Sequence, residues 1–246
     1  SLTYHLIYYF NPMSTLTPAA QRIAALRAAM KTHRLDLYIV PTADPHNNEY
    51  VADRWKGREW LSGFTGSAGT LIVSLEKAAL WTDSRYFLQA EKELAGSGIE
   101  LMRMGVEGVP SESEWMKSVV GYTLENGDEL SFSHLDHNPR IGFDFMGVSY
   151  EPQMDMVYDL ADFLVDIDLL EEIWENRPAL PNHSVYLQPE KWTGESIVAK
   201  MERLRVFVKQ QHAQYYMTND ASEIAWLLNL RGEDIAYNPV FLAYLI

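Results

Sequence analysis

Apolar residues near the start of the chain recur at intervals of four, three and four, which places them on one face of a helix. They are Ala19, Ile23, Leu26 and Met30. Thr17 followed by Pro18 predicts where this helix begins, because threonine caps free amides and proline misses no hydrogen bond at the first helical position. A continuous apolar run at 37–40 then ends at Pro41 and predicts a buried strand.

Residues 60–87 carry the densest pattern in the chain. Gly63, Gly66 and Gly69 are evenly spaced and predict a bend that larger residues could not follow. Two β-prone runs come next, Thr70–Leu75 and Ala78–Trp81, and the two residues between them predict a hairpin.

Asp83 follows the hairpin and is predicted to be the N-cap of the next helix. The apolar face of that helix would be Phe87, Ala90 and Leu94. Arg85 would then lie in the first helical turn, where a cation opposes the helix dipole.

Further strands are predicted at Ile99–Met104 and Arg140–Phe145. Ser111 and Glu114 have the spacing of a capping box that opens a helix, with Trp115 facing inward. Helices and strands thus alternate with short connections, which favours an α/β fold. Because the hairpin is antiparallel, we expect a mixed sheet flanked by helices in a three-layer-like arrangement.

Residues 141–176 contain ten acidic side chains and no lysine or arginine. Their apolar stripe predicts a helix whose acidic side is solvated, an interpretation favoured over a cation-binding surface. The stripe consists of Met154, Val157, Tyr158, Ala161 and Leu164–Val165. The sequence D-F-L-V-D-I-D-L-L after it predicts a strand entering a helix, and E-N-R-P-A-L-P predicts a linker.

These patterns divide the chain into three parts. We predict an N-terminal extension at 1–13, a first domain at 14–176, and a linker with a truncated second repeat at 177–246.

The repeat is visible as matching residues at fixed offsets. Leu204-Arg205, Lys209 and Tyr215-Tyr216-Met217 follow their counterparts Leu26-Arg27, Lys31 and Leu37-Tyr38-Ile39 at an offset of 178 positions. Trp226-Leu227 and Gly232 follow Trp60-Leu61 and Gly66 at an offset of 166.

The run V-F-L-A-Y-L-I at 240–246 would be the counterpart of the strand that begins at Thr70, so the second copy is incomplete. An open strand edge is a template for pairing. We expect residues 240–246 to pack on the first domain or to pair with a second molecule.

Composition narrows the function classes. The formal net charge is −14 and no cluster of Lys and Arg occurs, which argues against nucleic acid as a partner. No apolar run is long enough to span a membrane, and we expect no membrane partner. The chain has no cysteine, which removes thiolate chemistry and fits a reducing cytoplasm.

Most candidate chemical motifs have a simpler explanation. The three glycines lack the spacing of either nucleotide-binding fingerprint, and Ser67 is not in a G-x-S-x-G elbow because Thr65 stands at the first glycine position. Two loops offer metal ligands of the nitrogen and oxygen type, but loop polarity explains both. Their candidate ligands are Asp44, His46 and Glu49 in one loop, and His134, Asp136 and His137 in the other.

Arg85 has two interpretations of similar weight. A nearby carboxylate such as Asp83 could neutralise it, or its guanidinium could be presented to a carbonyl or carboxylate of a ligand.

Several motifs together resemble the amino-terminal part of the Xaa-Pro aminopeptidase (aminopeptidase P) family, of the three-domain type. They are N-E-Y-V-A at 48–52, L-S-G-F-T-G-S-A-G-T at 61–70, A-A-L-W-T-D-S-R-Y-F-L-Q-A at 78–90, I-W-E-N-R-P at 173–178 and E-I-A-W-L-L-N-L-R-G-E-D-I-A-Y-N-P-V-F at 223–241. The resemblance covers about 18–246 in the family's order, and it implies the creatinase-type N-terminal fold, which occurs twice in the family.

The resemblance also implies an activity, the removal of an N-terminal residue that precedes proline from a peptide substrate. It places two divalent metal ions, typically manganese, in a third domain beyond this sequence, so no catalytic or metal residue is carried over. It assigns Arg85 to the first domain and directs it towards the substrate site. A homo-oligomer such as a dimer is expected.

Two functions therefore stay open. The chain is either a non-catalytic part of a metallo-aminopeptidase that shapes substrate access and assembly, or a stand-alone module that binds peptides or partners. The first is favoured, and the chain alone is expected to be inactive.

Overall fold

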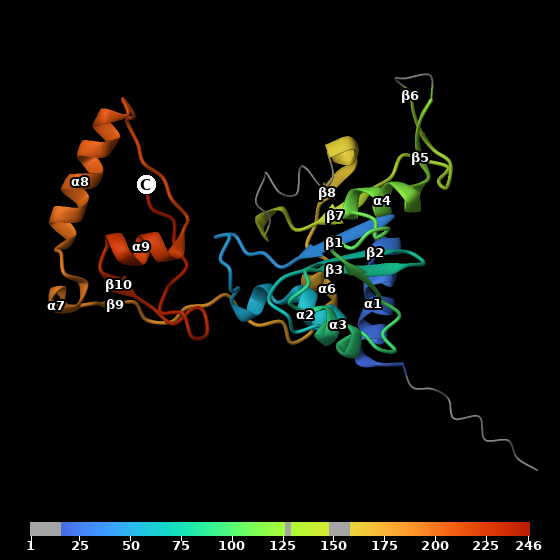
Figure 1. Ribbon diagram of the computed structural model, residues 1–246, viewed down its shortest axis with the longest axis horizontal. Helices are drawn as coiled ribbons and strands as arrows, with labels where there is room; N and C mark the ends of the chain where they lie inside the picture. Colours follow the sequence, from blue (N-terminus) through green and yellow to red (C-terminus); the bar gives the residue numbers. More distant parts are fainter. Residues whose placement is uncertain (1–15, 126–128, 148–157) are drawn as a thin grey trace, which may run out of the picture.

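The computed structural model describes residues 16–125, 129–147 and 158–246. Its main feature is a six-stranded sheet in the order β4-β3-β2-β1-β7-β8 (Figure 1). The strands are β1 (Leu37–Pro41), β2 (Thr70–Ser74), β3 (Ala78–Thr82), β4 (Glu100–Arg103), β7 (Ile141–Phe143) and β8 (Leu164–Asp166). β2 is antiparallel to β1 and β3, whereas the other three pairs are parallel. The predicted mixed α/β sheet is confirmed.

Helices cover both faces of this sheet. They are α1 (Pro18–Thr32), α2 (Gly57–Ser62), α3 (Phe87–Glu93), α4 (Glu112–Val120) and α6 (Leu170–Ile173), with 3₁₀ turns η1 (Asp53–Trp55), η2 (Phe145–Gly147) and η3 (Tyr158–Phe163). Residues of β1 alternate between two apolar cores: Tyr38 and Val40 pack with α1, and Leu37 and Ile39 pack with α4. This alternation is the period of two expected of a strand buried on both faces.

The predicted ends of α1 and α4 are confirmed. The Thr17 hydroxyl accepts the Ala20 amide at 3.2 Å, with Pro18 at the first helical position. Ser111 and Glu114 form the full capping box that begins α4. A short hairpin of β5 (Tyr122–Glu125) and β6 (Glu129–Phe132) follows α4 and was not predicted.

The helix predicted across the acidic stretch is wrong where it can be checked. Its part at 148–157 lies outside the described residues. The rest forms η3, and Leu164–Val165 belong to β8. Leu164 and Val165 are β-prone residues that pair with β7, so sheet pairing overrides the helical period here. The predicted passage from a strand into a helix is confirmed by β8 and α6.

The second unit contains α7 (Glu190–Thr193), α8 (Ile197–Gln210), α9 (Ala221–Leu227), and the short antiparallel pair β9 (Tyr186–Leu187) and β10 (Leu230–Arg231). Figure 1 shows it beside the first unit, with α8 at the outer edge. The linker is anchored by Arg177, which contacts Asp168 at 2.5 Å and Glu171 at 3.0 Å. The Arg54 guanidinium in turn donates to the Pro178 carbonyl at 3.1 Å.

The repeat extends to individual interactions. In the first unit Arg22 of α1 donates to the Trp60 carbonyl at 2.5 Å and lies 5.0 Å from the Trp60 ring. In the second, Lys200 of α8 donates to the Trp226 carbonyl at 2.7 Å and lies 4.3 Å from that ring. Lys200 and Trp226 stand at the repeat offsets of 178 and 166 from Arg22 and Trp60. A cation from α1 therefore stabilises the end of α2 in the first unit, and a cation from α8 stabilises the end of α9 in the second.

The strand expected at 240–246 is wrong as a full strand. Within the described residues its only pairing is an antiparallel bridge between Thr218 and Leu245, and Tyr215–Met217 form no strand either. The segment does pack on the first unit: Val240 and Phe241 share an apolar cluster with Ala52.

A polar contact close by adds to this join. His46 Nδ1 lies 3.0 Å from the Asn219 carbonyl oxygen, and the His46 ring lies 4.8 Å from the Tyr244 ring. Of the two arrangements expected for residues 240–246, packing on the first domain is the one observed.

The repeat allows a matched stability test. Leu26 of α1 is fully buried, whereas Leu204, its counterpart on α8, is half-buried. We expect Leu26→Ala to lower the free energy of unfolding by about 2–5 kcal/mol, since it leaves a cavity in a packed core. Leu204→Ala should cost about 1 kcal/mol or less. Urea denaturation followed by circular dichroism measures both, and equal losses would contradict the different burial of the two helices.

Candidate functional site

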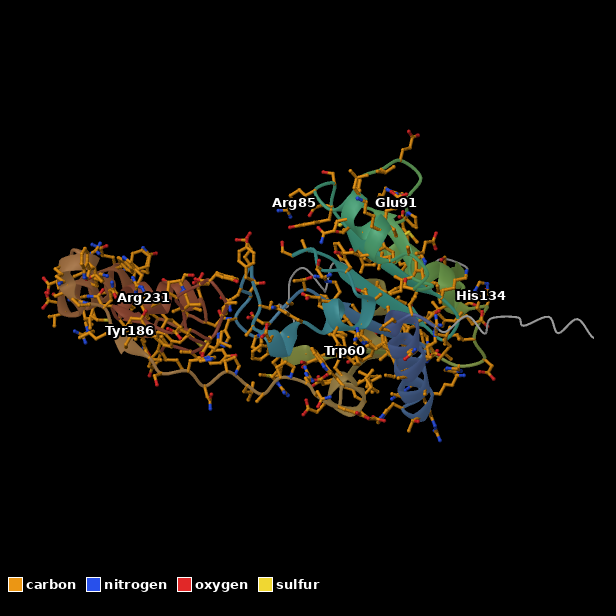
Figure 2. All side chains as sticks on the ribbon, turned by 90° about the horizontal axis from the view of Figure 1, so that it is seen from below. Trp60, Arg85, Glu91, His134, Tyr186 and Arg231 are labelled. Carbon is orange, nitrogen blue, oxygen red and sulfur yellow. The ribbon has the colours of Figure 1, made fainter. Side chains whose placement is uncertain are left out.

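The predicted site residue Arg85 lines a groove at one edge of the sheet, where β1 and β3 end and β2 begins. The groove has a volume of about 490 Å³. It is bordered by the polar loop at 47–49, by the glycine loop at 67–69, and by the turn that holds Asp83 and Arg85. Figure 2 shows Arg85 at the surface of the first unit. The sheet therefore brings three loops, distant in sequence, around one guanidinium.

Arg85 forms a two-pronged ion pair with Asp83. Its Nε and Nη2 atoms donate to the two Asp83 carboxylate oxygens, each at 2.8 Å. This pairing confirms the interpretation in which Asp83 neutralises Arg85. The hydrogen bonds from Arg85 lower the pKa of Asp83 to about 2 and raise the pKa of Arg85. The Arg85 side chain is nevertheless 64% exposed, so part of the guanidinium faces solvent above the groove.

The prediction that Asp83 caps the next helix is wrong. The helix begins at Phe87 and its N-cap is Tyr86. The Asp83 carboxylate instead accepts the backbone amide of Arg85, two residues on, at 3.0 Å, a local turn that competes with capping. Arg85 therefore lies in the turn before the helix and not in its first turn, so it does not oppose the helix dipole there.

The glycine loop is held by Arg58, a residue that the sequence did not single out. Arg58 is 4% exposed. Its Nη1 donates to the Phe64 carbonyl at 2.8 Å, its Nη2 donates to the Gly66 carbonyl, and its Nε donates to the Thr42 hydroxyl at 2.8 Å. The guanidinium also lies 4.8 Å from the centre of the Phe64 ring. Burial lowers the pKa of Arg58 to about 10.

The glycines serve this bend, as predicted. Gly63 follows α2 with a φ of +77°, which favours glycine. At Gly66 an added Cβ would lie 2.2 Å from the Phe64 ring, so no larger residue fits there. The Ser67 hydroxyl lies 2.7 Å from the Tyr86 hydroxyl, a contact that fixes the loop and supplies no general base.

The two candidate metal loops carry structural contacts. Asp44 accepts the amides of His46 and Asn48, both at 3.0 Å. His137 lies between Asp136, at 2.7 Å, and Asp36, at 3.2 Å. Across the part of the chain that the structure describes, no three His, Asp or Glu side chains are arranged to hold a metal ion. Neither loop therefore supplies a set of metal ligands among the described residues.

Comparison with known proteins defines the class of this chain. Two family models, both described as the creatinase/prolidase N-terminal domain, match residues 22–170 and 176–246. The first of these alone covers more than half of the chain, and this chain belongs to the creatinase/prolidase N-terminal domain family. Two matches with one description accord with the internal repeat.

The individual relatives are peptidases. The chain is 39% identical to a probable Xaa-Pro aminopeptidase P of Neosartorya fischeri, over 97% of this chain and 35% of that protein. It is 38% identical to aminopeptidase P2 of Arabidopsis thaliana, over 86% of this chain and 29% of that protein. The chain thus spans about a third of the length of the curated relatives it matches.

One solved structure is similar to this chain over most of its length. It is the X-prolyl aminopeptidase of Caenorhabditis elegans, described as a cytosolic enzyme with a di-nuclear active site. The two share 29% sequence identity with a TM-score of 0.78, over 93% of this chain and 37% of that one. Among the described residues of this chain, none of the helices is long and apolar enough to cross a membrane.

Arg58 allows a direct test of what holds the groove. Arg58→Met would leave the Thr42, Phe64 and Gly66 oxygens without their donor in a buried place, and we expect it to lower the free energy of unfolding by about 3 kcal/mol or more. Arg58→Lys should restore little, because an ammonium cannot reproduce the planar fork. Arg85→Met, at an exposed arginine nearby, serves as the control and should change stability far less, because exposed ion pairs contribute little. Similar losses for the two methionine variants would contradict the role of Arg58.

The ion pair at Asp83 predicts a specific titration. The pKa of Asp83 is lowered by Arg85 in the folded chain, so the pair stabilises the fold above the ordinary aspartate value and this contribution is lost as the pH falls towards 2. Carboxyl carbon NMR of the intact chain should give a pKa near 2 for Asp83. In Arg85→Ala it should return towards about 3.9. An unchanged Asp83 pKa in this variant would contradict the pairing.

Proposed function

We propose that this chain is the N-terminal, non-catalytic part of a metal-dependent Xaa-Pro aminopeptidase, an enzyme that removes an N-terminal residue preceding proline from peptides. The observation that carries the proposal is the extent of the match. One relative with this activity in its name aligns with 97% of this chain at 39% identity, and the chain covers 35% of that relative. A non-catalytic region at the N-terminal end of a longer enzyme would account for both the 97% of this chain and the 35% of the relative that are aligned.

The chemistry in this proposal belongs to residues outside the sequence. The described residues hold no cluster suited to a metal, and the relative from Caenorhabditis elegans is described as having a di-nuclear active site. We therefore assign two divalent metal ions, with manganese as the first candidate, to a later domain. The chain alone should be inactive.

Substrate access is the role we assign to the Arg85 groove. The part of its guanidinium that faces solvent can donate to a peptide carbonyl or carboxylate, and the two hydrogen bonds to Asp83 hold that donor in position. Domain limits at 14–176 and 177–246, a homo-oligomer and a cytoplasmic location complete the proposal. The location is supported by the relative described as cytosolic.

A comparison of the full-length protein with this chain tests the proposal. With manganese and a peptide that has proline at the second position, the full-length protein should release the first residue and the 246-residue chain should not. No cleavage of such peptides by the full-length protein would overturn the proposed activity, and cleavage by the chain would overturn its non-catalytic role.

The part played by Arg85 is tested in the full-length protein. We expect Arg85→Ala to reduce kcat/KM by about tenfold or more, the value of a charged hydrogen bond to substrate. Arg103→Ala is the matched control, because Arg103 is a half-buried arginine paired with Glu91 at 3.3 Å and lies outside the groove. Equal kinetics for the two variants would remove Arg85 from the substrate path.

A further inference from the structure

A second hollow lies between the two units, next to the Arg85 groove. It has a volume of about 280 Å³. One wall comes from the first unit and includes Tyr50, Trp55 and Glu59, and the other comes from the turn at 235–237 in the second unit. Glu49 borders both this inter-unit cleft and the Arg85 groove. A ligand could therefore extend from one into the other.

The turn at 235–237 is held by a buried side chain and a backbone hydrogen bond, and it exposes an aromatic ring. Ile235 is 2% exposed and anchors the turn in the apolar cluster, and the Asn238 amide donates to the Ile235 carbonyl at 3.1 Å. Tyr237 at the tip is fully exposed, with a φ of +62°. A bulky residue in this backbone region is strained, and such strain is concentrated at functional sites.

The two cationic side chains of the inter-unit cleft, Lys56 and Arg58, already interact with other residues of this chain. The Lys56 ammonium lies 2.6 Å from an Asp53 carboxylate oxygen. The Arg58 guanidinium is turned into the glycine loop, where all three of its nitrogens donate to protein oxygens. Binding a ligand would require Lys56 to leave a surface ion pair and Arg58 to leave its buried hydrogen bonds.

The carboxylates of the inter-unit cleft are different. Across residues 16–125, 129–147 and 158–246, no side-chain hydrogen bond or ion pair is formed by Glu49 or Glu59. Each carboxylate still attracts an arginine electrostatically, Glu49 attracting Arg85 and Glu59 attracting Arg58. In their ionised form both carboxylates accept hydrogen bonds and donate none. Two exposed tyrosine rings, Tyr50 and Tyr237, stand at the same hollow. Carboxylates beside aromatic faces are the surroundings that favour an organic cation.

We propose that the inter-unit cleft binds the cationic side chain of an arginine or lysine in a peptide. The aliphatic stem of that side chain would pack on Trp55 and the tyrosine rings, and its charged end would meet Glu49 and Glu59. The net charge of −14 adds a long-range attraction for such a ligand. The inference rests on the proposed function in taking the ligand to be a peptide, and it adds a preference for a basic residue.

Binding can be measured on the 246-residue chain without any catalysis. The probe is Nα-acetyl-arginine amide, and its uncharged control is Nα-acetyl-citrulline amide, which has nearly the same shape. Backbone amide NMR shifts should saturate at millimolar arginine probe, with the largest changes at Thr65, Gly66, Ile235 and Ala236, which line the inter-unit cleft. The citrulline probe should bind at least fivefold more weakly.

Variants separate the carboxylates from general surface charge. Glu49→Gln combined with Glu59→Gln should weaken the arginine probe at least fivefold, and Tyr237→Ala should weaken it about threefold. Glu76→Gln, at an exposed glutamate of the β2–β3 turn, should leave binding unchanged. Matching amide spectra away from the inter-unit cleft show that each variant is folded.

Three results would overturn the inference: equal binding of the two probes, unchanged binding by the Glu49/Glu59 double variant, or shifts confined to residues outside the inter-unit cleft. A full-length protein without Xaa-Pro cleavage would overturn the proposed function and leave the measured binding intact. The two failures are therefore distinguishable.

Discussion

The buried guanidinium of Arg58 is the interaction on which the candidate site depends. Its three donors connect the Thr42 hydroxyl, just after β1, with two carbonyls of the glycine loop before β2. A buried charge is costly unless its hydrogen bonds are satisfied, and here an unpaired loop backbone supplies the acceptors. The guanidinium thus obtains acceptors for its hydrogen bonds, and the loop carbonyls obtain donors. The bend that results borders both the Arg85 groove and the inter-unit cleft.

Each of the two units also places a cation at the end of a short helix. Arg22 over Trp60 and Lys200 over Trp226 each combine a hydrogen bond to the end of a short helix with a cation on an aromatic face. A residue with positive φ follows each helix: Gly63 comes directly after α2, and Asn229 comes one residue beyond the C-cap Leu228 of α9. Asparagine is the residue that best replaces glycine in this conformation. Different residues therefore make the same kind of contact in the two copies of the repeat.

Much of the first unit could be predicted because its local signals agree with its burial. The period of α1, the capping box of α4 and the β2–β3 hairpin each combine an apolar pattern with a specific end signal. Where a signal had a local competitor, the prediction was wrong. The Asp83 carboxylate bonds the Arg85 amide two residues away, and this turn delays the helix to Phe87.

The remaining features depend on contacts that one sequence does not display. Arginine is mostly an exposed residue, so nothing in the pattern around Arg58 indicates that its partners are carbonyls eight residues away or fewer. Glu49 and Tyr237 both line the inter-unit cleft although most of the chain separates them. A helical or strand period relates only residues that are close in sequence, so it cannot predict this proximity. The resemblance of its motif to the family predicted Arg85 as a site residue. The closeness of Asp83 in the sequence predicted that the two side chains pair.

We propose that the Arg85 groove faces a peptide substrate in the full-length protein. Photo-cross-linking tests this proposal most directly, with a proline-containing peptide that carries a benzophenone near its carboxyl end, bound to the full-length protein and mapped by mass spectrometry. We expect attachment within residues 47–50, 65–69 or 82–86, lost when unlabelled peptide competes. Competed attachment confined to residues beyond 246, with none in the first domain, would contradict it.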